Sequence, residues 1–314
     1  MAPDAEAHLV LGASGGVGSA VARLLAEQGK QVVAVNRSGK IDAPDGVRVI
    51  AANALDAENI KSACAGAGVI YHCVHPKEDY STFTAMTQNI ISAAEKVGAR
   101  LVMAASAYPY GKVNGPMRED MPYKPEAPSG EFHARAATLV MDAHRKERVR
   151  AAIARASNYF GPNASRMWPG VDFKVALEGE KASVIGDVDQ PHTYTYVDDF
   201  ARGMITLAEH DEALGEVWHV PSAPTITTRQ FLEMVYAEAD SELSIQAGSR
   251  LILTVMGWFK PDIRPALEVL YQFEEPFILN HSKFEKAFGA SPTPNEDAIQ
   301  TTVAWFRKHK NNSG

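Results

Sequence analysis

The sequence has few cysteines and no long apolar runs, and each absence narrows the class of protein. Its 314 residues include only Cys64 and Cys73, which form no C-x-x-C pair and fit a reducing compartment. No apolar run is long enough to cross a bilayer, and the first residues are acidic and polar, unlike a signal peptide. We therefore expect a cytoplasmic protein with no membrane segment.

Basic charge is not in excess either. The chain has 31 Lys and Arg against 38 Asp and Glu, a formal net charge of −7. This balance favours solubility and offers no broad basic surface for nucleic acid. The length allows either one large α/β domain or two modest ones, each with a full core.

Glycine, in contrast, is concentrated where a short apolar run at residues 8–11 ends and an apolar pattern with helical spacing follows. This is the pattern of a strand, a tight turn and a helix. Three glycines spaced three apart provide an unusual backbone angle, close approach of a phosphate, and tight packing of helix on strand. The helix start would direct free N–H groups at a pyrophosphate. The residues expected to bind a dinucleotide here are Gly12, Ser14, Gly15, Gly16, Val17 and Gly18.

The same turn also fits a rival motif. Residues 12–16 match the G-x-S-x-G nucleophile elbow of serine hydrolases. A hydrolase needs earlier strands to build its sheet and oxyanion loop, whereas only a short polar tail precedes this strand. A second strand at residues 31–35 follows at the distance that a parallel β-α-β unit requires. The context therefore favours dinucleotide binding.

The end of that second strand carries Asn36, Arg37 and Ser38 in place of an acidic residue. An acidic side chain there would bind the ribose hydroxyls of NAD and repel a 2′-phosphate, whereas Arg37 can pair with that phosphate. We therefore predict NADP, with NAD the weaker alternative, and Ser14 as a second phosphate contact. The competing interpretation is a solvent-exposed arginine in a turn.

Strand and helix patterns alternate along the first half of the chain. Strands are predicted at 47–50, 69–74, 100–105 and 151–155, and helices at 21–28, 57–65, 82–97 and 135–145. Repeated β-α-β units imply a parallel sheet covered on both faces, with ligands at the carboxyl ends of the strands. We therefore predict an α/β fold, a Rossmann-type doubly wound sheet with a smaller C-terminal substrate-capping region.

The regular alternation weakens after about residue 160, where prolines and glycines become frequent. We assign 1–160 to a dinucleotide-binding domain, with return segments at about 188–221. Residues 161–187 and 222–314 would form the substrate-binding region. A helix at 228–239 would have Thr227 or Thr228 as its N-cap.

Six motifs together resemble the extended short-chain dehydrogenase/reductase family, often labelled NAD-dependent epimerase/dehydratase. They lie at 12–18, 53–56, 69–74, 106–111, 155–162 and 195–201. The resemblance implies that Asn53 and Ala54 approach the adenine and that Cys73, Val74 and His75 line the cofactor, with Asn158 also at the cofactor. A metal site formed by His72, Cys73 and His75 is the alternative for that segment. Successive strand residues face opposite ways, so packing is favoured and no metal is predicted.

In that family a serine orients the substrate oxygen, a tyrosine moves the proton, and a lysine four residues later holds the nicotinamide ribose. Ser106 matches the serine, but the Tyr-x-x-x-Lys pair is missing. The favoured register puts Glu131 at the tyrosine position and Arg135 at the lysine position; a shift by one gives Phe132 and Ala136. An arginine could support the cofactor, whereas a carboxylate is a poor substitute for a phenol.

Another residue must then move the proton if the family's reaction takes place. The candidates near the expected crevice are Tyr108, Tyr110, His133 and Tyr159, of which Tyr110 is the one assigned to catalysis beside Ser106 and Arg135. For each of them, a packed or hydrogen-bonded structural role is the alternative.

The substrate side also departs from the family's nucleotide-sugar enzymes. Those usually place an arginine before the stretch matched by 195–201, and this chain has His192 nearby. Neutral imidazole is a poor clamp for a diphosphate. Apolar side chains could instead line a pocket for a less charged substrate, although core packing explains them equally well. They are Trp168, Met256, Trp258 and Phe259.

We therefore expect an NADP(H)-dependent oxidoreductase or redox isomerase acting on a small, mostly apolar carbonyl or alcohol. The alternative is a non-catalytic NADP(H) sensor that signals through a partner, and a nucleotide-sugar epimerase or dehydratase is a third option. A homodimer could form through the helices predicted at 82–97 and 135–145, as in relatives.

Overall fold

The computed structural model describes residues 7–76, 79–164, 172–248 and 264–309. Seven parallel strands form the central sheet, in the order β11-β6-β5-β4-β1-β2-β3. Their bounds are β1 Ala7–Leu11, β2 Val32–Asn36, β3 Arg48–Ala51, β4 Ala67–His72, β5 Arg100–Ser106, β6 Arg150–Ala156 and β11 Val217–His219. This is the predicted doubly wound α/β fold, and β1 lies at the point where the strand order reverses.

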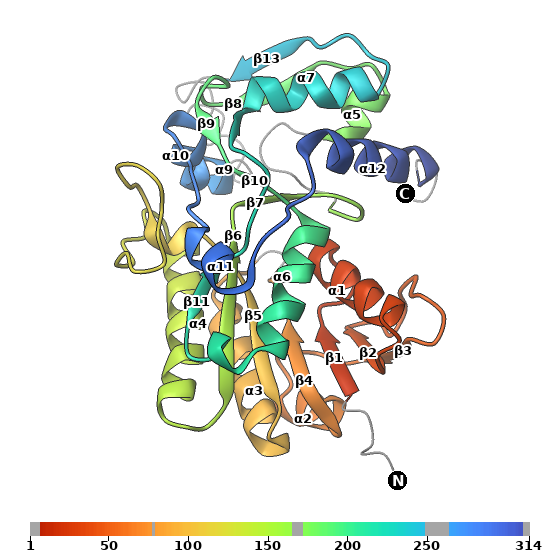
Figure 1. The fold of residues 1–314 in the computed structure, drawn as a ribbon, viewed down its shortest axis with the longest axis vertical. Coiled ribbons are helices and arrows are strands. Elements are labelled where there is room, and N and C mark those ends of the chain that lie inside the picture. The colour runs from red at the N-terminus through yellow and green to blue at the C-terminus, as the bar shows by residue number, and fades with distance from the viewer. Residues whose placement is uncertain (1–6, 77–78, 165–171, 249–263, 310–314) are drawn as a thin grey trace.

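Two helix layers cover the sheet (Figure 1). α1 (Gly16–Glu27) and α6 (Val197–Glu209) pack on one face, around Val10, Val21 and Phe200. α2 (Ala57–Ala63), α3 (Thr82–Val97) and α4 (Pro128–Arg145) pack on the other, around Leu9, Ile90 and Val140. The inner strands are buried on both faces because β-α-β crossovers place a helix over each side, whereas the edge strand β3 stays partly exposed.

The remaining elements gather at the carboxyl ends of the strands, in the upper part of Figure 1. Three two-stranded sheets lie there: β7 (Asn158–Phe160) with β10 (Tyr194–Tyr196), β8 (Ala182–Ile185) with β13 (Ile245–Gly248), and β9 (Pro191–His192) with β12 (Ile226–Thr227). The helices are α5 (Phe173–Leu177), α7 (Thr228–Glu238), α9 (Arg264–Val269), α10 (Tyr271–Glu274), α11 (Ser282–Phe288) and α12 (Asn295–Lys308). Thr227 caps α7 through a reciprocal bond pair with Gln230, one of the two predicted N-caps.

Element boundaries differ from the prediction mainly at α4. This helix begins at Pro128, seven residues before the predicted start, because proline is well suited to the first helical position. β4 also begins and ends two residues earlier than predicted. Among the described residues, no helix is long and apolar enough to span a bilayer.

The glycine turn depends on close packing of backbone against backbone. A Cβ on Gly18 would lie 2.8 Å from the carbonyl carbon of Gly12, whereas a Cβ on Gly15 would have nothing nearer than 3.7 Å. We expect Gly18→Ala to lower the free energy of unfolding by about 1–3 kcal/mol, because backbone cannot move aside as a side chain can. Gly15→Ala is the matched control and should leave it nearly unchanged. Urea denaturation of both variants checks this, and equal midpoints would contradict it.

Candidate functional site

The glycine turn joins three elements at the carboxyl ends of the strands. Gly12 has φ +85°, and a Cβ there would lie 2.5 Å from the carbonyl oxygen of Cys73, just after β4. Gly12 therefore has to be glycine for both its backbone angle and its packing. Gly15 has room for a Cβ, whose nearest neighbour would be the carbonyl oxygen of Gly12 at 3.7 Å, and α1 begins at the next residue, Gly16. An anion placed there would meet the free N–H groups of the helix start.

A segment that the sequence did not single out covers this turn. Asn163, with φ +60°, donates from Nδ2 to the backbone oxygen of Ser14 and to Oγ of Ser19, both at 3.2 Å. Next to it, Ala164 packs against Gly16, where an added Cβ would lie 3.1 Å away. The family-like motif at 155–162 was visible in the sequence, but the contact of the residues after it with the glycine turn was not. These contacts fix the conformation of the turn.

Asn36, the last residue of β2, hydrogen-bonds through its side chain to the turn that follows the strand. Oδ1 of Asn36 accepts a bond of 2.7 Å from the backbone of Gly39, and its Nδ2 donates to the backbone oxygen of Lys40 at 3.0 Å. Asn36 is thus committed to its own turn. Arg37 and Lys40 are exposed beside it, and neither forms an ion pair within the described part of the chain. This corner offers positive charge without a fixed acceptor for ribose hydroxyls.

The residues expected at the adenine and along the cofactor follow β3 and β4. The backbone N–H of Asn53 donates to Oδ1 of Asn59 at 2.7 Å, and the carbonyl of buried Ala54 accepts from Asn89 at 2.9 Å. Val74 and His75 follow Cys73; Val74 is half-buried and His75 is exposed. Burial raises the pKa of the Cys73 thiol to about 12, so it stays protonated near neutral pH.

His72 faces into the core beneath this segment. Its Nδ1 accepts from the backbone N–H of Val74, so its Nε2 donates to Oγ1 of Thr87 at 3.1 Å. Burial lowers its pKa to about 3, so the ring is neutral. Both ring nitrogens of His72 are therefore engaged in hydrogen bonds within the core. No group of three metal-ligating side chains occurs within the described ranges.

Ser106 ends β5, next to Ala156 of β6. Its Oγ is buried and has no hydrogen-bond partner within the part of the chain that the structure describes. A buried hydroxyl without a partner costs stability unless a ligand or water satisfies it. The position and the free hydroxyl suit a group that orients a substrate oxygen.

The rotation of α4 differs from the expected register. Glu131 and Arg135 lie on the outer face, with side chains 54% and 63% exposed, and pair with each other at 3.3 Å. Arg135 therefore does not point toward the cofactor crevice, which corrects the sequence prediction for this residue. The inward positions are Ser129 and His133, which are 7% and 4% exposed. They are four residues apart, so they share one helix face, as tyrosine and lysine of a Tyr-x-x-x-Lys pair would.

His133 lies in a cluster of rings between α3, α4 and the segment after β4. Its ring centroid is 5.0 Å from that of Phe83 and 5.4 Å from those of both His75 and Tyr108. Neither ring nitrogen has a hydrogen-bond partner among the described residues. Burial lowers the pKa of His133 to about 3, with smaller contributions from His75 and Arg155. The ring is a neutral imidazole with one donor and one acceptor unused.

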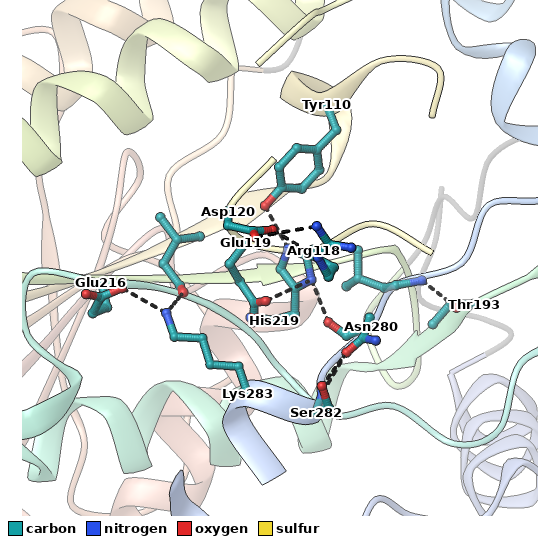
Figure 2. A network of polar contacts seen from close by, with 12 residues as sticks. Tyr110, Arg118, Glu119, Asp120, Thr193, Glu216, His219, Asn280, Ser282 and Lys283 are labelled. Atoms are coloured by element: carbon teal, nitrogen blue, oxygen red, sulfur yellow. Dashed lines mark hydrogen bonds and ion pairs between the residues drawn. The ribbon is translucent and has the colours of Figure 1, made fainter. Parts of the chain in front are cut away.

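Tyr110 has a structural role instead of the predicted catalytic one. Nδ1 of His219 donates to the carbonyl of Asn280 at 2.8 Å, so Nε2 accepts, and the Tyr110 hydroxyl donates to it at 2.8 Å. Figure 2 shows this network, in which Glu119 also accepts from the backbone of His219. The Tyr110 ring stacks on buried Arg155, and burial raises the Tyr110 pKa to about 12. Its hydroxyl is therefore committed to His219 of β11, whose other ring nitrogen joins β11 to the C-terminal segment.

The other two candidate phenols are those of Tyr159 and Tyr108. Tyr159 donates its hydroxyl to the backbone oxygen of Ala105 at 3.2 Å. Tyr108 is half-buried beside His133, and burial raises its pKa far above the usual range. Neither phenol is poised to release a proton near neutral pH.

On the substrate side, His192 is buried among rings and hydrogen-bonds Asn158 and the backbone of Gln272. Asn158 is half-exposed at the start of β7. The predicted pocket residues Trp168, Met256, Trp258 and Phe259 lie outside the described residues.

These features define the class of protein to which the chain belongs. A doubly wound parallel sheet whose first strand runs into a glycine turn, with the start of a helix beyond it, is a Rossmann-type dinucleotide-binding architecture. Residues 8–220 match the model of the NAD dependent epimerase/dehydratase family. Because the match covers more than half of the chain, this protein belongs to that family.

Two relatives show how far sequence similarity extends. The uncharacterized protein y4nL of Sinorhizobium fredii is 24% identical over 93% of this chain and 87% of its own length. UDP-glucuronic acid decarboxylase 1 of Xenopus tropicalis is 31% identical, over 42% of this chain and 34% of that protein. The chain thus spans about a third of the decarboxylase.

Solved structures extend the likeness in fold to nearly the whole chain. An epimerase from Methanothermobacter thermautotrophicus superimposes with a TM-score of 0.84 and 18% identity, covering 98% of this chain and 94% of that one. UDP-glucuronic acid 4-epimerase from Bacillus cereus, in complex with UDP-glucuronic acid and NAD, superimposes with a TM-score of 0.80 and 18% identity. The match covers 96% of this chain and 99% of that one. The family brings with it a nicotinamide dinucleotide as cofactor.

The buried histidines predict how stability depends on pH. Burial lowers the pKa of His72, His133, His192 and His219 to about 3. The unfolded chain binds protons at these residues below about pH 6.5 and the folded chain does not, so stability falls as pH drops toward 3. At pH 5 each of these histidines lowers the free energy of unfolding by about 2 kcal/mol relative to its value well above pH 6.5.

The test is urea denaturation of wild type and His72→Gln between pH 4 and 7. Glutamine can still donate to Thr87, and one titrating group is removed. We expect the slope of stability against pH to fall by about 1.4 kcal/mol per pH unit in the acid range. Parallel curves for the two proteins would show that His72 is not a neutral, buried group.

Proposed function

We propose that this protein is an NADP(H)-dependent oxidoreductase or redox isomerase acting on a small, mostly apolar carbonyl or alcohol. The observation that carries the proposal is the buried hydroxyl of Ser106, which has no hydrogen-bond partner among the described residues and stands at the carboxyl end of β5, the same end of the sheet as the glycine turn. The fit to the dinucleotide rests on the open space at Gly15 and the start of α1 beside it. When bound, the nicotinamide would supply or accept the hydride.

The protein's own groups would position the reactants. Ser106 would donate its hydroxyl proton in a hydrogen bond to the substrate oxygen, which becomes more negative as hydride arrives at the carbon. His133 lies on the inward face of α4, and its neutral imidazole would bond a ribose hydroxyl both as donor and as acceptor. Arg135 remains on the outer face and has no part in this scheme.

The choice of NADP rests on the corner after β2. Several structural neighbours bind NAD by their own descriptions, the B. cereus epimerase among them. Here Asn36 is committed to its turn, and two exposed cations, Arg37 and Lys40, stand beside it. A 2′-phosphate would gain charge-assisted bonds at this corner, whereas ribose hydroxyls would find no carboxylate.

A non-catalytic NADP(H) sensor is the second candidate, and α4 supplies the observation that favours it. The inward position four residues before His133 is Ser129, whose aliphatic hydroxyl is a far weaker acid than a phenol. His133 is neutral because burial lowers its pKa to about 3, so it is a poor proton donor as well as a weak base. The activities of the nucleotide-sugar relatives are the third possibility.

We also infer a cytoplasmic location and a homodimer. Both cysteines are free thiols, as a reducing compartment requires. The outer faces of α3 and α4 form an open groove of about 550 Å³ whose lining includes Thr84, Ala134 and Leu139. Light scattering should give twice the chain mass of 34.0 kDa, and Leu139→Glu should give the mass of one chain. A single-chain mass for wild type would exclude the dimer.

The cofactor proposal is tested by titrating NADPH and NADH separately, following fluorescence. Arg37→Ala should weaken NADPH binding by about 10- to 100-fold and leave NADH binding unchanged, because a hydrogen-bonded charge pair contributes about 1.5–3 kcal/mol. Arg118→Ala, at an exposed arginine paired with Asp120, is the control. Tighter binding of NADH than of NADPH, unaffected by Arg37→Ala, would overturn the assignment.

The enzyme proposal is tested by screening cyclic ketones and aromatic aldehydes for oxidation of NADPH, the corresponding alcohols for reduction of NADP⁺, and hydroxyketones and UDP-sugars for isomerised product by chromatography. Ser106→Ala should lower kcat about 10²- to 10³-fold on an active carbonyl compound, as expected for loss of a hydrogen bond to the reacting oxygen. Its affinity for NADPH should match wild type. Tight NADPH binding with no turnover of any compound would instead support the sensor.

A further inference from the structure

His192 occupies a closed aromatic environment between the sheet and the C-terminal segment. It is 1% exposed, stacked on Phe273 at 4.8 Å and 7°, with Phe277 at 5.2 Å and Tyr194 at 4.7 Å. Nothing there can hydrate a charged ring, and burial lowers its pKa to about 3. A neutral imidazole has one nitrogen that donates and one that accepts.

The backbone decides which nitrogen donates. Nδ1 of His192 lies 3.1 Å from the carbonyl oxygen of Gln272. A carbonyl oxygen can only accept, so Nδ1 carries the hydrogen. Nε2 therefore carries a lone pair and needs a donor opposite it.

The group opposite Nε2 is the side-chain amide of Asn158. Its Oδ1 is assigned to the position 3.0 Å from Nε2. That arrangement would set an oxygen against a lone pair, whereas the amide turned by 180° fills the same space with Nδ2 there. We propose that Nδ2 of Asn158 donates to Nε2 of His192, so that Oδ1 of Asn158 is the atom presented outward. His192 is then a positioning residue for Asn158.

The outward atom of Asn158 is available to a ligand. Asn158 begins β7, two residues after Ala156, which pairs with Ser106 at the crevice. The residue is half-exposed, so it is not sealed into the core as His192 is. With Nδ2 held by the uncharged ring of His192, Oδ1 is the amide atom left to accept a hydrogen bond from a ligand.

The chemistry of the ligand follows from this. A carbonyl oxygen recognises a hydrogen-bond donor, such as a hydroxyl or an amide N–H, and repels the oxygens of a diphosphate, which only accept. This inference rests on the proposed function and narrows its substrate class to compounds that donate a hydroxyl or amide N–H to Asn158 and place no diphosphate against it.

The first experiment is ¹⁵N NMR of the full-length protein labelled at histidine, with the His192 signals assigned by their absence in His192→Phe. We expect one protonated nitrogen and one bare nitrogen, with the proton on Nδ1. Two protonated nitrogens would mean a cationic His192 that donates to Oδ1 of Asn158 and would overturn the proposal.

The second experiment follows the side-chain NH₂ of Asn158. Its protons should be protected from exchange in wild type and in His192→Gln, because glutamine can also donate to Gln272 and accept from Asn158. They should lose this protection in His192→Leu, which has no acceptor. Equal protection in all three proteins would show that His192 does not orient the amide.

The third experiment uses UDP as the probe for a diphosphate, added to the protein at saturating NADPH. A dissociation constant weaker than about 1 mM supports the proposal, and a tighter one overturns the substrate class. Failure of the proposed function would be visible separately, as absent NADPH binding, while the nitrogen signals still report the orientation of Asn158.

Discussion

The structure depends on the contact of backbone with backbone at the glycine turn. Gly12 lies against the carbonyl of Cys73, and Gly18 lies against Gly12, so β1, β4 and α1 meet without a side chain between them. This contact fixes the position of the helix start and of the open space at Gly15. Everything proposed about the dinucleotide follows from that geometry, because the same strand ends also carry Ser106 and Asn158.

Around this frame the inward-facing polar groups of the site are neutral. On α4 they are Ser129 and His133. His192, another buried and neutral ring, stands near the expected diphosphate clamp. Such a site suits recognition by hydrogen bonds and apolar contact more than by charge, which favours an uncharged substrate.

Sequence patterns could predict the sheet and the glycine turn because both depend on local spacing. They could not predict the rotation of α4, since counting from Ser106 does not show which helix face meets the sheet. The apolar spacing of Ala136, Ala137 and Val140 was the available signal, and it points to His133. The partner of Tyr110 could not be found either, because His219 lies 109 residues away in the sequence.

The central claim is that an NADP(H) molecule lies along this crevice with its reactive ring beside Ser106. A crystal structure with NADP⁺ tests it most directly. We predict the pyrophosphate above Gly15 at the start of α1, the 2′-phosphate at Arg37, and the nicotinamide ribose within hydrogen-bond distance of His133. A nicotinamide remote from both Ser106 and His133, or a 2′-phosphate with no contact to Arg37, would contradict the account.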